Sequence, residues 1–164
     1  MEKVLIDIEI YSEFNNSLER FWAEFEKNAV MSPFQSYAWL SNWQQTVGGP
    51  LLSVLPQVVR VTTDNKTQAI FPFGIRKSFG IKILEWLGGI NADYMGPLFH
   101  SSFFDNEYLL QNIWNKVKSE INNFDVIHFQ RQTDKTIQFL KKIDFAYISN
   151  KNLKSYKTTL PSTW

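Results

Sequence analysis

The chain has 164 residues, a formal net charge of +1, two histidines and no cysteine. This length predicts one domain that can bury a hydrophobic core without disulfides or metals. The lack of cysteine excludes a thiol nucleophile and a cysteine-based metal site, and His100 and His128 are too far apart to predict a zinc site. A net charge this close to zero argues against a dedicated nucleic-acid binder.

The N-terminus lacks the uninterrupted apolar stretch of a signal peptide, and no apolar run approaches the ~20 residues that span a bilayer. We therefore expect a cytoplasmic protein without a membrane span. Aromatic residues make up 16% of the chain, which predicts a core rich in rings. Residues 1–30 carry seven acidic and three basic side chains, and an excess of this size is typical of a solvated surface.

A strand and a helix are predicted at the start of the chain. Residues 4–10 alternate in polarity and contain β-branched side chains, which is typical of a strand. Residues 17–29 predict a helix that is capped by Ser12 or Asn16. Its apolar stripe, at helical spacing, consists of Leu18, Phe21, Trp22 and Phe25.

A second helix carries two tryptophans. It begins either at a capping box over residues 32–35 or one turn later at Ser36, and it ends near Gly48. Trp39 and Trp43 are one turn apart on this helix and share a face. Such a pair is typical of a core, but it also suits the wall of a binding site.

An antiparallel meander is predicted in the middle of the chain. Residues 52–63 and 68–77 predict two strands joined by a tight turn, and residues 81–89 predict a third. Pro56 and Pro72 lie inside these strands, which indicates bulges or positions at a sheet edge.

The segment after the meander is irregular and aromatic, and a helix follows it. Asp105 is the expected cap of a helix over residues 107–122. The apolar face of this helix consists of Leu110, Ile113, Trp114, Val117 and Ile121. Residues 125–130, DVIHFQ, predict a short buried strand, so His128 is expected to be a core residue rather than a base.

The last elements complete the fold prediction. Thr133 or Asp134 caps a helix through Lys142, and residues 146–150 open a further strand. The order of elements predicts an α/β (α+β) fold with a mixed, mostly antiparallel twisted sheet and helices on both faces.

Three segments of the sequence, together with this order of elements, resemble a known family. They are FQSYAWLSNW at residues 34–43, IFPFGIRK at residues 70–77 and LEWLGGINADYMGPLF at residues 84–99. Together they resemble the N-terminal half of CelD-like acetyltransferases. These proteins have two GNAT-like lobes, are similar in build to Fem-type aminoacyltransferases, and are associated with cellulose and exopolysaccharide synthesis. The resemblance implies that residues 1–164 form one GNAT-like lobe, either the N-terminal half of a longer protein or an unusually short member.

The resemblance also raises the question of acyl-CoA. A GNAT fold holds the pyrophosphate of acetyl-CoA with a loop of the type Q/R-x-x-G-x-G/A before a helix, and this motif is absent here. An acidic Asp105 at the expected helix start would repel phosphate. We therefore expect no cofactor in this lobe, whereas the resemblance implies acetyl-CoA or another acyl-CoA for the full-length family.

The polar candidates for a site are Asp93, Tyr94 and Arg76. Asp93 and Tyr94 lie in a loop beside glycines, where they could orient an acceptor or donate a proton, or else form a turn and fill a gap. Arg76 ends a strand as an anion contact or as a solvated cation. His100 is a possible base, although spacing places no partner acid beside it. These assignments leave the catalytic residues unknown.

The function expected from the resemblance is the acceptor side of an acyltransferase. Trp39 and Trp43, with Trp43 the more exposed, would line the groove for a small-molecule acceptor that carries an amine or hydroxyl, such as an amino sugar. The missing C-terminal lobe would supply the acyl group. The alternative is a binding or scaffold domain without catalysis, for carbohydrate or a partner protein in polysaccharide biosynthesis. An exposed apolar face would mark the junction with the second lobe and favour a homodimer.

Overall fold

The computed structural model describes residues 5–100 and 107–143. The expected cap at Asp105 and the expected strand at residues 146–150 lie outside these residues. No described helix is long and apolar enough to cross a membrane.

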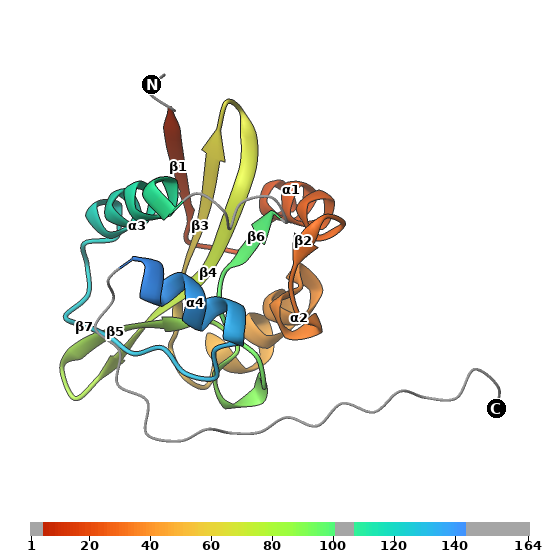
Figure 1. Cartoon of the computed structure of the whole chain (residues 1–164). Helices are drawn as coiled ribbons and strands as arrows, with labels where there is room; N and C mark the ends of the chain where they lie inside the picture. The colour runs from red at the N-terminus through yellow and green to blue at the C-terminus, as the bar shows by residue number, and fades with distance from the viewer. Residues whose placement is uncertain (1–4, 101–106, 144–164) are drawn as a thin grey trace, which may run out of the picture.

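Seven described strands form one sheet in the order β1-β3-β4-β5-β7, with β6 paired to β4 and β2 paired to β6 (Figure 1). All pairs are antiparallel except β5 and β7, which run parallel. The strands are β1 (Ile6–Tyr11), β2 (Ala29–Val30), β3 (Leu55–Thr63), β4 (Lys66–Ser78), β5 (Ile81–Trp86), β6 (Leu98–His100) and β7 (Val126–Ile127). The mixed, mostly antiparallel sheet predicted from the sequence is confirmed.

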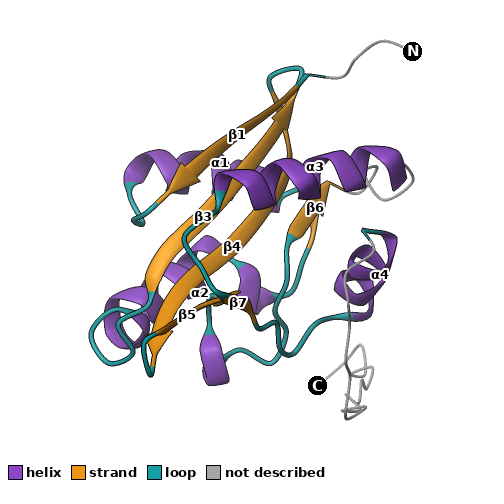
Figure 2. Ribbon diagram, turned by 90° about the vertical axis from the view of Figure 1, so that its left-hand side faces the viewer, coloured by secondary structure: helices purple, strands orange, loops and turns teal. Residues whose placement is uncertain are grey.

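Helices cover both faces of this sheet, as predicted (Figure 2). The helices are α1 (Asn16–Glu26), α2 (Tyr37–Trp43), α3 (Glu107–Glu120) and α4 (Asp134–Lys142). Short helical turns η1 (Pro33–Gln35) and η3 (Gly89–Asn91) lie in loops, and α2 continues as the π-helical turn η2 (Gln44–Gly48).

Polar side chains fix where the helices begin. Asn15 caps α1 by accepting from the Leu18 N–H at 3.0 Å, so both expected caps are wrong, Asn16 by one residue and Ser12 by three. Both predicted starts of the second helix are used, because η1 begins at Pro33 and α2 begins after Ser36, whose hydroxyl accepts from the backbone N–H of Trp39.

Strand β4 supplies both sides of the core. Its residues alternate between the two faces, as a strand requires. On one face Ile70 packs with the apolar stripes of α1 and α2, including the buried Leu18 and Trp22. On the other face Phe71 and Phe73 pack with the buried side chains of α3 and α4. One strand therefore ties both helix layers to the sheet.

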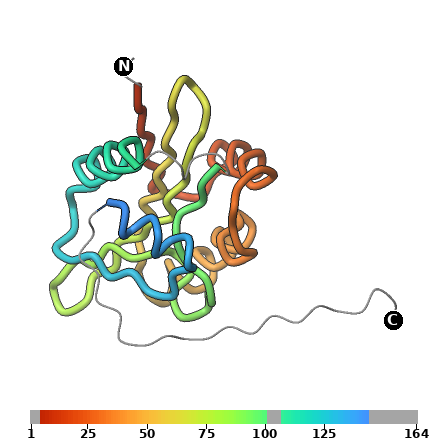
Figure 3. The backbone as a smooth tube through the Cα atoms, viewed as in Figure 1, coloured from red at the N-terminus to blue at the C-terminus, as the bar shows by residue number. Residues whose placement is uncertain are grey.

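Pro72 interrupts the pairing of β4 on one side. In a strand, the N–H and C=O of one residue point to the same neighbour. The Pro72 carbonyl accepts from the Leu87 N–H at 2.8 Å, so its missing N–H falls on the side of β5 and β6. Pairing with β5 ends at Phe73 and pairing with β6 resumes at Ile70. Residues 87–97 leave the sheet at this break, in light green between α2 and α4 in Figure 3.

Two expectations about the later strands are wrong. The third strand ends at Trp86 rather than at residue 89, because of this break. β7 is two residues long, pairs with β5 alone and is only partly covered, so it is not a buried central strand. His128 follows it and is exposed rather than a core residue.

Candidate functional site

The outer face of α2 and Asn91 of the excursion at residues 87–97 line an open pocket of about 570 Å³, which we call the tryptophan pocket. Its walls are two indole rings, small apolar groups and uncharged hydroxyl and amide groups. The lining residues are Pro33, Ser36, Ala38, Trp39, Asn42, Trp43, Thr46, Val47 and Asn91. None of them carries a charge, which distinguishes this pocket from most of the protein surface.

Trp43 forms the floor of the pocket. It is only 5% exposed, and its indole Nε1 donates to the Asn91 side-chain oxygen at 3.2 Å. Two glycines leave room for the ring: an added Cβ would lie 2.5 Å from it at Gly48 and 3.1 Å from it at Gly89. The expectation that Trp43 would be the more exposed tryptophan is wrong, because both flanking segments close over its ring.

Trp39 is the exposed ring of the pair, with 39% of its surface accessible. Phe34 packs against it edge to face at a centroid distance of 5.1 Å, and the Tyr94 ring lies 6.2 Å from the Phe34 ring, centroid to centroid. The fold therefore brings Trp39, Trp43 and Tyr94 to one end of the molecule, with Phe34 as the link.

Asp93 lies next to this cluster but is paired. Its carboxylate accepts from Arg131 Nη1 at 3.1 Å, and the same nitrogen donates to the Ala92 carbonyl. Arg131 adopts a φ of +50°, which is uncommon for a residue with a side chain. An exposed pair of this kind contributes little to stability, on the order of 0–1 kcal/mol. Its main effect is to balance the charge that Asp93 would offer to a cationic ligand.

Arg76 does not join the other candidates. It lines neither described pocket, and its guanidinium makes a two-pronged pair with Glu85, with Nε to Oε1 at 3.0 Å and Nη2 to Oε2 at 3.2 Å. The Arg76 side chain is neither free nor fully solvated, because it forms an ion pair with Glu85 on the neighbouring strand. An anion contact at Arg76 would require this pair to open.

At the place where the resemblance implies an acyl-CoA loop, the described residues include one side chain that disfavours phosphate. The loop at residues 101–106 lies outside the described residues, but Glu107 occupies the first turn of α3, where a carboxylate disfavours phosphate. The segments that follow the parallel strands β5 and β7 are joined to each other, in the region where sheets commonly bind ligands. There the Met95 N–H donates to the Arg131 carbonyl at 2.8 Å. Within the described residues, no group of acids and histidines could hold a metal ion.

Sequence reasoning missed Asn91 and Arg131. Asn91 bonds to Trp43, which is 48 positions away, and Arg131 bonds to Asp93, which is 38 positions away. No local spacing in the sequence identifies such distant partners. Glu85 carried a usable signal. It lies in the predicted third strand, next along the chain from the strand that Arg76 ends, and a register for these two strands would have placed the two side chains close together.

Comparison with known proteins gives the fold and no closer relationship. Neither a family model nor a curated protein sequence matches the chain. A possible acetyltransferase from Clostridium difficile 630 matches with a TM-score of 0.51 and 10% identity, over 94% of this chain and 99% of that one. A GNAT family acetyltransferase from Staphylococcus aureus subsp. aureus USA300_TCH1516 matches with a TM-score of 0.50 and 12% identity, over 93% and 98%.

A third solved structure, an aminoglycoside acetyltransferase from an uncultured soil metagenomic sample in complex with sisomicin, matches at a TM-score of 0.45 and 15% identity, which is too low to support a conclusion. At the identities of the first two matches, the likeness concerns the fold alone. The chain has the α+β fold of GNAT acetyltransferases, with a mostly antiparallel sheet and helices on both faces.

Proposed function

We propose that this chain is the acceptor-side lobe of a cytoplasmic acyltransferase that acts in polysaccharide biosynthesis. In this proposal it is the N-terminal half of a CelD-like protein, and a second lobe holds the acyl-CoA. The observation that carries the proposal is the uncharged tryptophan pocket on a chain with the GNAT fold. The acidic first turn of α3 supports the assignment of the acyl donor to another lobe.

The lining of the tryptophan pocket favours a neutral acceptor. An ammonium group is best bound by a carboxylate, but no acid lines the pocket and the nearby Asp93 is paired with Arg131. Indole rings with amide and hydroxyl groups suit the apolar face and the hydroxyl groups of a sugar. Of the two acceptor groups expected from the sequence, amine and hydroxyl, the pocket therefore favours the hydroxyl.

The chain would act on the acceptor by positioning it. The exposed face of Trp39 offers a stacking surface. The Ser36 and Thr46 hydroxyls donate to backbone carbonyls of their own segment, so they offer acceptors to a ligand, and Asn42 offers its amide oxygen and its second amide proton. Trp43 fixes Asn91 at the opposite wall. Holding an acceptor in one orientation is a large part of catalysis in direct group transfer. We assign no general base, because Tyr94 and Asp93 lie outside the pocket lining.

The sugar-binding step is tested with the chain itself and neutral oligosaccharides, by calorimetry and by tryptophan fluorescence. We expect Trp39→Ala to weaken binding about tenfold or more, because the stacking surface is lost. Tyr108→Ala is the matched control, since Tyr108 is an exposed aromatic residue on α3, across the sheet from α2. Equal affinities for both variants would rule out the tryptophan pocket as the acceptor site.

The acyltransferase assignment is tested by release of free thiol from acetyl-CoA with panels of sugars, amino sugars and amines. We expect no turnover by residues 1–164 alone and turnover by the product of the complete reading frame. Turnover by residues 1–164 alone would contradict the division of labour between two lobes. A reading frame that stops directly after Trp164 would contradict the two-lobe proposal itself.

The second candidate function is a non-catalytic domain that binds carbohydrate or a partner protein. The same uncharged pocket favours it, and it predicts sugar binding without turnover in either chain length. Four exposed apolar side chains lie at one end of the meander: Leu52 and Leu55 near the start of β3, and Phe79 and Ile81 around the β4–β5 turn. They support docking of a further lobe or a second copy of the chain. Light scattering of the chain, with Leu55→Lys as the variant, tests this surface.

A further inference from the structure

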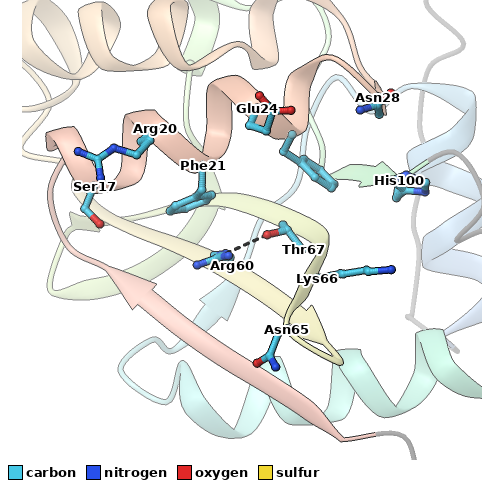
Figure 4. Close-up of a pocket in the computed structure, with 11 residues that line it drawn as sticks. Ser17, Arg20, Phe21, Glu24, Asn28, Arg60, Asn65, Lys66, Thr67 and His100 are labelled. Atoms are coloured by element: carbon cyan, nitrogen blue, oxygen red, sulfur yellow. Dashed lines mark hydrogen bonds between the residues drawn. The ribbon is translucent and has the colours of Figure 1, made fainter.

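A second cavity, which we call the basic pocket, lies on α1 and shares no residue with the tryptophan pocket. Its volume is about 650 Å³, within the range of small-molecule sites. Three segments far apart in sequence form it: α1 with the residues just after it, the β3–β4 hairpin, and the end of β6 (Figure 4). No motif in the sequence links these segments, so a common site was not predicted.

Arg60 is the fixed cation of the basic pocket. Its guanidinium lies 4.5 Å above the Phe21 ring, donates from Nε to the Thr67 hydroxyl oxygen at 2.9 Å and from Nη1 to Glu9 at 3.0 Å. The side chain is only 23% exposed. These two bonds and a further side-chain hydrogen bond with Tyr11 do not occupy all five N–H groups of the guanidinium, so donors remain for a ligand in a preorganised fork.

Two further cations line the pocket from different elements. Arg20 comes from α1 and Lys66 from the first position of β4, and neither has a hydrogen-bond or ion-pair partner among the described residues. The one acid in the lining, Glu24, is paired with Lys27. Outside the lining, Glu9 is held by Arg60. Arg20 and Lys66 therefore place two unpaired positive charges on the walls of the pocket.

Neutral hydrogen-bonding groups complete the lining of the basic pocket. Asn28 and Ser17 lie toward opposite ends of α1, and Asn65 and Thr67 belong to the β3–β4 hairpin (Figure 4). Because the Thr67 oxygen accepts from Arg60, its own proton is available to a ligand. Phosphate groups present at least three strongly accepting oxygens, whereas a carboxylate presents two. A wall with this many donors matches phosphate better than carboxylate.

We propose that the basic pocket binds a small phosphate-bearing molecule, with Arg60 as the central contact and Arg20 and Lys66 as flanking contacts. The site is separate from the acceptor pocket, and the inference does not rest on the acyltransferase proposal. Pyrophosphate is the minimal probe, because it carries the anionic groups and nothing else.

The test is calorimetry of the chain with pyrophosphate at low and moderate salt. We expect binding that weakens as salt rises, and about fivefold to tenfold weaker binding for Lys66→Gln and for Arg20→Gln. Both side chains are exposed and unpaired, so the variants retain the fold, which circular dichroism verifies. Arg60 is left intact because it also holds Glu9 and Thr67.

Lys77→Gln is the matched control. Lys77 is an exposed lysine near the opposite end of β4 from Lys66, and it does not line the pocket. The substitution therefore removes the same charge at a position outside the pocket. Its affinity for pyrophosphate should equal that of the original chain. The proposal is overturned if the original chain shows no binding at millimolar pyrophosphate, if Lys77→Gln weakens binding as much as Lys66→Gln, or if succinate binds as tightly as pyrophosphate.

Discussion

Gln35 joins two segments that are 61 residues apart. It is 3% exposed, and its amide nitrogen donates to the Gly96 carbonyl at 2.9 Å and the Pro97 carbonyl at 3.3 Å. Its amide oxygen accepts from the Ser32 N–H at 2.8 Å. One buried side chain therefore satisfies backbone groups on both sides and holds the excursion at residues 87–97 against the start of α2.

Replacing Gln35 tests this role. We expect Gln35→Ala to lower the free energy of unfolding by about 2–3 kcal/mol, because buried backbone groups lose their partner. Gln130→Ala is the control, since Gln130 is exposed and bonds only to His128 among the described residues. Urea titration measures both variants, and a loss below about 0.5 kcal/mol for Gln35→Ala would show that solvent or a neighbour replaces its bonds.

Gly96 marks the closest approach of the excursion to α4. Its φ is +147°, and an added Cβ would lie 2.2 Å from the Thr136 hydroxyl oxygen. We expect Gly96→Ala to destabilise the fold by at least about 2 kcal/mol, because both the backbone and the contact oppose a side chain.

The matched control is Gly80→Ala, which has a positive φ of +83° but no atom within 4 Å of the new Cβ. Its expected cost is about 1–2 kcal/mol, from backbone conformation alone. Equal melting temperatures for the two variants would mean that the contact with Thr136 relaxes freely.

At the scale of elements, the start of α1 is set by a single side chain. Asn15 is outside the helix with a ψ of 172°, and its carboxamide oxygen accepts from the Leu18 N–H. Neighbouring Asn16 is the first helical residue and is exposed. Two consecutive asparagines therefore differ in role, since one satisfies a backbone donor and the other only occupies a helical position.

This difference is measurable by thermal unfolding. We expect Asn15→Ala to cost about 1 kcal/mol, because a helix donor loses its partner. Asn16→Ala should be neutral or slightly stabilising, since alanine has the higher helix propensity. The opposite order of melting temperatures would place the cap at Asn16.

At the scale of the whole molecule, the two core clusters share β4 and should unfold together. Leu18 on α1 and Leu110 on α3 are both fully buried, but on opposite faces of the sheet. We expect Leu18→Ala and Leu110→Ala each to cost about 2–5 kcal/mol. Each should shift the urea midpoints from circular dichroism and tryptophan fluorescence by the same amount. Separate transitions for the two probes would show that the two helix layers are independent.

The sequence predicted those parts of the fold whose signal is local. The apolar stripes of α1 and α3 lie at helical spacing. The predicted caps Ser36 and Thr133 precede the first residues of α2 and α4. The hairpin of β3 and β4 follows from its turn residues. β2 had no such signal, because two residues are too few to show alternation. The strand predicted at residues 125–130 exists as β7, but only over two residues.

The candidate site was predictable only in part. Its tryptophans and the Asp93–Tyr94 loop could be named, because both are unusual within a few residues of sequence. Which tryptophan would be exposed could not be predicted, because burial of Trp43 depends on Gly89, a residue distant in sequence. The basic pocket escaped prediction for the same reason, since its cations are spread from Arg20 to Lys66.

The break at Pro72 has a consequence for how this fold can diverge. β5 pairs with the part of β4 after Pro72, and β6 pairs with the part before it. The register of each strand on β4 therefore does not depend on the number of residues that connect β5 to β6. Chain length around Ile90 is therefore free to change between lineages without shifting a strand. The walls of the tryptophan pocket would be remodelled each time, while both hydrophobic layers stayed in place. A fold built in this way can acquire new ligands by insertion and deletion as well as by substitution.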